Sequence, residues 1–207
     1  MIKKKISEVE RHKIVELQNK SELTEDGKQG LEYLIDKRGL KKETIIEFKL
    51  GYIPGFIDHQ LKNRIIFPLY DPSGNLIAVH SRSVSDDSLL PKYWHEGFEK
   101  SFYLYGIHLS RDAIRKFNWC LVVEGQFDIL QLFNYGVRNV VALSGNKMSQ
   151  VQMSVVRRYC DEVVLLLDRD ENKAGQRGSE KIMEDRFCDF GRFNLTKSNS
   201  NESVFIK

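Results

Sequence analysis

Short apolar runs that alternate with amphipathic stretches from residue 117 onward constrain the fold most strongly. The runs are 119–123, 138–143, 162–167 and 190–195. The stretches with helical spacing between them are 127–135, 148–159 and 175–186. Short, wholly apolar runs separated by helices are typical of buried parallel strands joined by crossover helices. The pattern therefore predicts an α/β fold, with a parallel sheet and helices on both faces.

Acidic residues stand where two of these runs end. Glu124 follows the run 119–123, and Asp168 and Asp170 follow the run 162–167. Ligands of parallel sheets collect at the carboxyl ends of the strands, so we expect these carboxylates to converge there with Ser144-Gly145-Asn146. Carboxylate oxygens are hard ligands that suit Mg²⁺ or Mn²⁺. We predict a divalent metal site, in which Glu124 is either a ligand or a general base.

The part before residue 117 has a different pattern and predicts a smaller α+β region. Two short helices are expected, one around 31–35 ended by Gly39 and one around 45–50 ended by Gly51. Strand-like runs at 64–70 and 76–80 flank turn residues 71–75, which predicts a hairpin with Pro68 at an edge or a bulge. The segment 85–100 is predicted as loop. The predicted domains are 1–116 and 117–207.

Composition narrows the class of protein. With 207 residues, of which 41% are hydrophobic, the chain can bury one sizeable core or two small ones. The three cysteines are too few and too widely spaced for a disulfide framework or a zinc ribbon, so no zinc is expected in this chain. No segment has the length and apolarity of a membrane span or an export signal, which predicts a cytoplasmic location without a membrane partner. The net charge of +3 leaves the partner open.

Two sets of residues resemble a known family. Glu124-Gly125-Gln126-Phe127-Asp128 followed by Asp168-Arg169-Asp170 resembles the Toprim domain of DnaG-type primases, topoisomerases and several nucleases. The upstream blocks resemble the DnaG catalytic core, in the same order and at similar spacing. They include Asn63 to Leu69, Gly74 to Ile77, Arg82, Pro91 to Tyr93 and Leu104 to Gly106. The resemblance spans roughly residues 30–195.

The resemblance implies a DNA primase, a nucleotidyltransferase that makes short RNA primers on single-stranded DNA. Its implied substrates are ribonucleoside triphosphates and a template strand, and its further partners a replicative helicase or a separate zinc-binding protein. Glu124, Asp168 and Asp170 would hold Mg²⁺ or Mn²⁺, and Asp128 would support the catalytic site. The positions implied in template or nucleotide binding are Asn63, Arg64, Arg82, Lys92 and Lys100. Without zinc-ribbon and helicase-binding modules, the sequence looks like a bare core such as a phage or mobile element might encode.

Other interpretations stay open. A short Asp-x-Asp motif is more often a turn or helix cap than a metal site. A Toprim nuclease would use the same acidic residues to cut nucleic acid. A catalytically silent module that binds template or helicase is favoured by Asn199-Ser200-Asn201, which stand where the family has a third acidic pair. The segment that follows Asp170 is also two residues longer than in the family.

Overall fold

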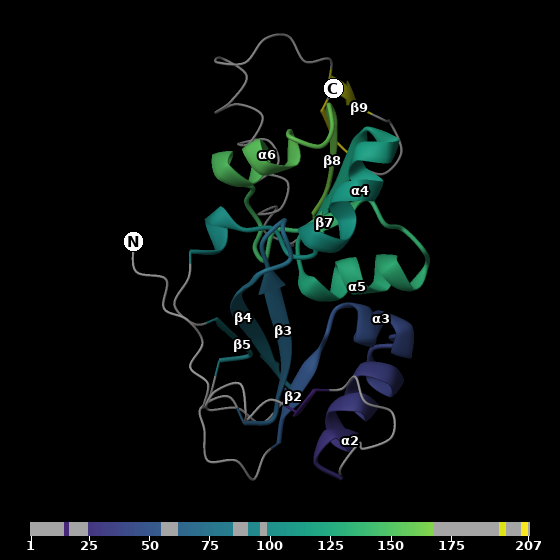
Figure 1. Cartoon of the computed structure of the whole chain (residues 1–207), viewed down its shortest axis with the longest axis vertical. Coiled ribbons are helices and arrows are strands. Elements are labelled where there is room, and N and C mark those ends of the chain that lie inside the picture. Colours follow the sequence, from purple (N-terminus) through teal and green to yellow (C-terminus); the bar gives the residue numbers. More distant parts are fainter. Residues whose placement is uncertain are drawn as a thin grey trace. The chain divides into compact units, whose positions relative to one another are not determined.

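The computed structural model describes residues 15–16, 25–54, 62–84, 91–95, 99–167, 195–197 and 204–206. The chain forms two compact units, Met1–Phe98 and Glu99–Lys207 (Figure 1). Each unit contains a five-stranded sheet. None of the helices in these ranges combines the length and the apolar character that crossing a bilayer requires.

The sheet of the first unit is antiparallel, with the strand order β1-β2-β3-β4-β5. Its strands are β1 (Val15–Glu16), β2 (Gly51–Ile53), β3 (Arg64–Tyr70), β4 (Leu76–Ser83) and β5 (Tyr93–His95). Three helical segments lie between β1 and β2 in the sequence: α2 (Glu25–Glu32), the π-helical turn η1 (Tyr33–Lys37) and α3 (Lys42–Glu47). Helix α2 packs closely on β2, because a Cβ atom at Gly30 would lie 2.5 Å from Cγ of Tyr52.

The predicted hairpin is confirmed as β3 and β4. Asp71 organises its turn by accepting hydrogen bonds from the backbone N–H groups of Ser73 (2.8 Å) and Asn75 (3.0 Å). Gly74 supplies a positive φ of 90°, which glycine adopts without strain. Pro68 lies on the central strand β3 but beyond the residues that pair with β2, and the register to β4 shifts between Leu69 and Tyr70. Pro68 itself pairs in register with Val79, and the irregularity begins one residue further along the strand.

The prediction that residues 85–100 form a loop is wrong for Tyr93–His95, which form the strand β5. β5 pairs with β4 through His80 and His95, Ser81 and Trp94, and Arg82 and Tyr93. A 3₁₀ turn, η2 (Lys100–Phe102), follows in the second unit. A strand of three residues is too short to show a period of two in the sequence, and Trp94 forms it by packing against an apolar cluster of Ile53, Ile66 and Val79.

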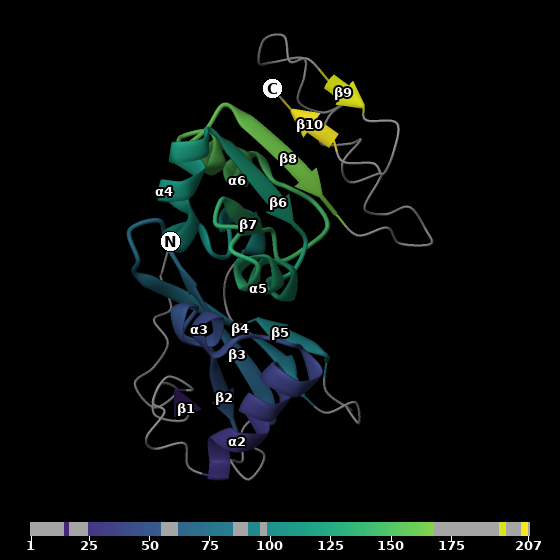
Figure 2. The same cartoon turned by 90° about the vertical axis from the view of Figure 1, so that its right-hand side faces the viewer.

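The sheet of the second unit has the order β7-β6-β8-β10-β9 (Figure 2). Its central strands β6 (Trp119–Val123), β7 (Val140–Ala142) and β8 (Glu162–Leu166) are parallel, as predicted. Three helices flank these strands: α4 (Ile107–Phe117), α5 (Gln126–Asn134) and α6 (Gln150–Val156). The parallel sheet and its flanking helices are therefore confirmed.

The outer part of this sheet differs from the prediction. β9 (Leu195–Lys197) and β10 (Val204–Ile206) form an antiparallel pair, and β10 runs antiparallel to β8. The predicted strand 190–195 overlaps β9 only at Leu195, and the predicted helix 175–186 lies outside the described residues. Because β10 comes last in the chain but pairs with β8, a pattern of neighbouring runs does not reveal it.

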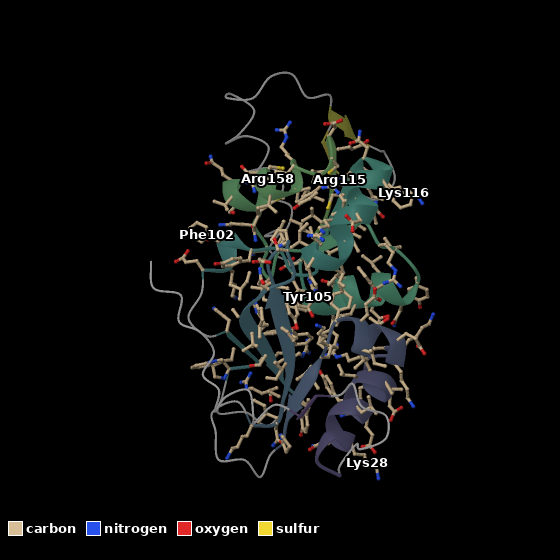
Figure 3. The ribbon with its side chains drawn as sticks, viewed as in Figure 1. Lys28, Phe102, Tyr105, Arg115, Lys116 and Arg158 are labelled. Carbon is tan, nitrogen blue, oxygen red and sulfur yellow. The ribbon has the colours of Figure 1, made fainter. Side chains whose placement is uncertain are left out.

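Helix α4 is part of the second unit, although the sequence analysis placed the domain boundary after residue 116. Its buried residues Ile107 and Ile114 belong to the core cluster around the parallel strands. Ser110 Oγ donates a buried hydrogen bond to the carbonyl of Val140 on β7 (2.6 Å). Tyr105, labelled in Figure 3, forms an antiparallel bridge with Ala142. The compact units accordingly divide between Phe98 and Glu99.

Candidate metal edge and nucleic-acid surface

Glu124 lies directly after β6, at the carboxyl end of the parallel strands, with a half-buried side chain. Its backbone carbonyl accepts a hydrogen bond from Gly145 N–H (3.3 Å), and Leu143 N–H donates to the carbonyl of Val123 (3.0 Å). The structure thus brings Glu124 together with the loop 144–146 that follows β7. This is the meeting of strand ends that the parallel arrangement requires.

Asp128 stabilises the turn between β6 and α5. Its Oδ2 accepts a hydrogen bond from Gly125 N–H (2.7 Å), where it satisfies one of the backbone donors left open at a helix start. A Cβ atom at Gly125 would approach this oxygen to 3.1 Å, so a small residue suits the position. The contact identifies Asp128 as a residue that holds the backbone next to Glu124.

Gln126 is a site residue for which the sequence analysis assigned no role. Its side chain is only 6% exposed, and its Nε2 donates to Oγ of Ser144 (2.8 Å). Ser144 has a φ of 61°, in the left-handed region that non-glycine residues seldom adopt. The sequence offered only a polar residue at the first position of the helix, and this does not reveal the partner 18 residues away.

Asp168 and Asp170 lie outside the described residues. The strand that precedes them is described, and Leu166, the last residue of β8, pairs in register with Val123 of β6. The two strands therefore end level with each other, Glu124 follows one, and Leu167-Asp168-Arg169-Asp170 follows the other. Within the described part of the chain, no three His, Cys, Asp or Glu residues form a group that could hold a metal ion.

Arg64 occupies a buried position on β3 and is 1% exposed. Its Nη1 donates to the carbonyl of Lys92 (3.4 Å), and its Nη2 donates to the carbonyl of Pro91. Burial lowers the pKa of this guanidinium from its ordinary value. Its neighbour Asn63 has a φ of 54° and accepts a hydrogen bond from the hydroxyl of Tyr52 (3.1 Å). Arg64 and Asn63 thus hold the protein's own chain in place.

The other predicted binding residues are placed differently. Arg82 on β4 is 9% exposed, and its guanidinium carbon lies 5.0 Å from the ring centroid of Tyr93. Lys92 is exposed, while its backbone carbonyl is held by Arg64 and by Ser83 N–H (2.9 Å). Lys100 begins η2 in the second unit, and its carbonyl accepts a hydrogen bond from Gln152 Nε2 (3.1 Å).

Three further basic residues lie near the amino ends of the parallel strands, opposite the end that leads into Glu124. Arg115 and Lys116 stand at the end of α4, and Arg158 in the turn after α6 (Figure 3). Arg115 pairs with Asp112 (3.4 Å) and lies over the ring of Tyr159 at 5.3 Å. Cations near helix carboxyl ends complement the helix dipole, so these residues are explained by the fold.

Three comparisons relate this fold and site to known proteins. A family model described as Toprim-like matches residues 121–202. The DNA primase of Halalkalibacterium halodurans is 30% identical over an alignment that covers 72% of this chain and 30% of that protein. A structure of the DnaG catalytic core has a TM-score of 0.68 and 25% identity, and it covers 82% of this chain and 63% of that chain.

A second solved structure is the DnaG primase catalytic domain bound to single-stranded DNA. It has a TM-score of 0.66 and 25% identity over 78% of this chain and 60% of that chain. These findings define the class: an α/β protein with a Toprim-like segment and the fold of the DnaG catalytic core. In sequence the chain is a relative of the DNA primases, and it spans about 30% of the length of the curated relative from H. halodurans.

Proposed function

We propose that the chain is a DnaG-type primase core that synthesises short RNA primers on single-stranded DNA. The observation that carries this proposal is the position of Glu124 on a fold like that of the DnaG core. The parallel strands β6 and β8 end at the same level; Glu124 follows β6 directly, and Asp168-Arg169-Asp170 come shortly after β8 in the sequence. The relationship to proteins named DNA primase supports the activity. The solved catalytic domain bound to single-stranded DNA supports the template.

The donor set fits a divalent metal. Glu124, Asp168 and Asp170 would hold Mg²⁺ or Mn²⁺, because all three offer carboxylate oxygens at adjoining strand ends. When bound, such ions neutralise the charge that builds on the transferring phosphoryl group and lower the pKa of a coordinated hydroxyl. Asp128 would support the site by holding Gly125 N–H through its Oδ2.

The chain's own contribution is positioning. Nucleotidyl transfer joins a 3′-hydroxyl oxygen to the α-phosphorus of a triphosphate, and pyrophosphate leaves with the bonding electron pair. The protein must hold its carboxylates fixed while this happens. Gly145 N–H holds the Glu124 carbonyl and Asp128 holds the N–H of the same peptide unit, after the Glu124 Cα. Leu143 N–H holds the Val123 carbonyl in the peptide unit before it, so the backbone on both sides of Glu124 is anchored.

Primer synthesis on single-stranded DNA with ribonucleotides and Mg²⁺ or Mn²⁺ tests the proposal. Glu124→Gln, Asp168→Asn and Asp170→Asn each remove a charge with little change of size, and each should lower the rate by a factor of about 100 or more. Glu162→Gln is the matched control, because Glu162 opens β8 at the opposite end of the strand. This variant should prime at the wild-type rate.

Three outcomes would contradict the proposal. Synthesis that persists in all three acidic variants would remove the site from the reaction. Cleavage of DNA or RNA by the wild type without synthesis would establish a nuclease instead. Binding of template without either reaction, under both metals, would establish a silent module.

A further inference from the structure

Lys147 stands exposed on the loop that joins β7 to α6, close to Glu124 (Figure 2). Within the described ranges no carboxylate forms an ion pair with it. A basic side chain near an acidic site that leaves it unpaired is a candidate for binding an anion that enters that site. The fold has to show that this lysine is held near the site rather than only near it in sequence.

The loop holds the backbone of Lys147 from both sides. Two residues before it, Gly145 N–H donates a hydrogen bond to the carbonyl of Glu124 (3.3 Å). Directly after it, Met148 is 2% exposed and belongs to the core cluster beside the parallel strands. The backbone is therefore fixed where the side chain is free, so binding a ligand there costs little ordering of the main chain.

The reach of the side chain covers the space beside Glu124. Two residues of chain span at most about 7 Å, so the Cα atom of Lys147 lies near Gly145, which itself contacts Glu124. Lysine adds a flexible four-carbon stem with a charged end. The ammonium group can thus reach the edge of the sheet where β6 and β8 end at the same level.

A second lysine is brought to the same loop. Ser149 Oγ donates a hydrogen bond to the carbonyl of Ser101, and Gln152 Nε2 donates to the carbonyl of Lys100 (3.1 Å). Lys147 precedes Ser149 by two residues, so two lysines from distant segments have neighbouring places in the fold. Like charges placed together repel each other, and an anion that both can approach relieves this repulsion. The pair favours a ligand that carries several negative charges.

We propose that Lys147 binds the β- and γ-phosphates of the incoming nucleoside triphosphate and so selects triphosphates over monophosphates. The inference rests on the function proposed above, which supplies the triphosphate. The acidic residues define where the α-phosphorus reacts, and Lys147 stands to one side of Glu124, where it matches the phosphates that are not transferred. Lysine suits this contact because its ammonium group acts as a point charge toward phosphate.

The contact involves no bond to the protein. When the 3′-hydroxyl oxygen bonds to the α-phosphorus, the bond from this phosphorus to the bridging oxygen breaks, and pyrophosphate keeps the electron pair. Lys147 holds the two outer phosphates before and after this step and transfers no proton. Free pyrophosphate should therefore bind to the same lysine.

Calorimetric titration of the full chain with ATP and with pyrophosphate, in the presence of Mg²⁺, tests the proposal. Lys147→Met removes the charge and keeps most of the stem, and it should weaken binding of both probes about ten-fold, as expected for one charge-assisted contact. Lys147→Arg keeps the charge and should bind within about three-fold of the wild type. Lys116→Met is the matched control, because Lys116 is an exposed lysine at the end of α4 (Figure 3) and should have no effect.

Primer synthesis separates this contact from a general disturbance of the site. Lys147→Met should raise the KM for ribonucleotides about ten-fold and leave kcat within about two-fold, since the contact is present before and during the reaction. Inhibition by added pyrophosphate should weaken by the same factor. A disturbed site would lower kcat instead. Unchanged KM and unchanged pyrophosphate inhibition in an active Lys147→Met variant would overturn the inference and leave the proposed function standing.

A further measurement uses the wild-type chain alone, so it does not depend on how a variant folds. Pyridoxal 5′-phosphate followed by borohydride should label Lys147, and pyrophosphate with Mg²⁺ should protect it but leave Lys116 open to labelling. Wild-type affinity in Lys147→Met, an equal loss in Lys116→Met, missing protection, or a wild type that binds neither probe would each overturn the inference. Binding that depends on Lys147 without primer synthesis would instead reject the proposed function and leave the phosphate contact in place.

Discussion

Arg64 is almost completely buried, and its guanidinium group contacts the protein's own backbone. The resemblance to the primase core implied a nucleic-acid contact at Arg64, and the residue alone could not reveal its burial, because a basic residue beside an apolar run looks the same whether it faces solvent or the interior. Its two carbonyl acceptors, on Pro91 and Lys92, lie 27 and 28 residues further along the chain. Only the folded chain brings them together, so no local pattern could have assigned Arg64 this contact.

Truncation of Arg64 should therefore reduce stability more than any other change at the predicted basic positions. Arg64→Ala removes the donor to the Pro91 carbonyl and one of the two donors to the Lys92 carbonyl, and it opens a cavity, which should lower the free energy of unfolding by about 2 to 4 kcal/mol. Lys92→Ala, at an exposed side chain, should stay within about 0.5 kcal/mol of the wild type. Denaturant unfolding of both variants checks this, and equal stabilities would contradict the buried role.

Cys160 should be unreactive in the folded protein. Burial raises the pKa of its thiol to about 11, so only about one molecule in a thousand carries the thiolate at pH 8. Alkylation by iodoacetamide, quantified for each cysteine by mass spectrometry, should be about 100-fold slower than in denatured protein. Because the folded pKa is raised, the thiol's contribution to stability is complete below about pH 8.5 and is lost as the pH rises toward 11. Rapid labelling at pH 8 would contradict this burial.

The buried amide of Gln126 should fix the loop that contacts Glu124. Gln126→Ala removes the donor to Ser144, whose left-handed backbone then loses its support, so amide exchange at Gly145 should accelerate about ten-fold or more. Gln126→Glu exchanges this donor for an acceptor of similar size and serves as the isosteric comparison. Hydrogen exchange by mass spectrometry makes the measurement, and unchanged exchange in both variants would show that the loop holds itself.

At the scale of elements, the β3–β4 hairpin should lose stability in acid. Partial burial alone would raise the pKa of Asp71, but hydrogen bonds from the Asn75 side chain and from backbone N–H groups outweigh it, and the pKa is lowered. A depressed pKa gives stability that is present above the unfolded value near 3.9 and lost as the pH falls through the folded value. Asp71→Ala should have a lower Tm than wild type at pH 7 and an equal Tm near pH 2. Parallel Tm curves across this range would contradict the turn's role.

The elements that could be predicted are those whose signal is local. The runs that became β3, β4, β6 and β8 are apolar enough to form strands wherever they pack, and Asp71 to Asn75 carry turn chemistry of their own. β5 could not be predicted because its pairing with β4 depends on Trp94 finding the cluster of Ile53, Ile66 and Val79. For the candidate site, the sequence placed Glu124 at the end of a parallel strand, as observed, but the contact between Gln126 and Ser144 required the loop after β7 to be in place.

At the scale of the whole molecule, the division between Phe98 and Glu99 has a direct test. A fragment of residues 99–207 keeps α4, whose Ile107 and Ile114 fill the core beside the parallel strands. A fragment of residues 117–207 lacks both, which should cost several kcal/mol, enough to abolish cooperative unfolding. Circular dichroism with thermal unfolding compares them. Equal cooperativity in the two fragments would instead support the boundary after residue 116.

The segment that carries Asp168 and Asp170 lies between β8 and β9 in the sequence. Because β10 pairs with both of these strands, the strands on either side of the segment belong to one sheet. A single proteolytic cut between residues 168 and 194 would therefore yield two polypeptides that remain associated through the ladder from Val163 to Leu165. Such a nicked protein would migrate as one species under native conditions and as two in detergent. The chain could accordingly be expressed as two complementing fragments, and a cut after Asp170 keeps the acidic pair on the fragment that contains β8.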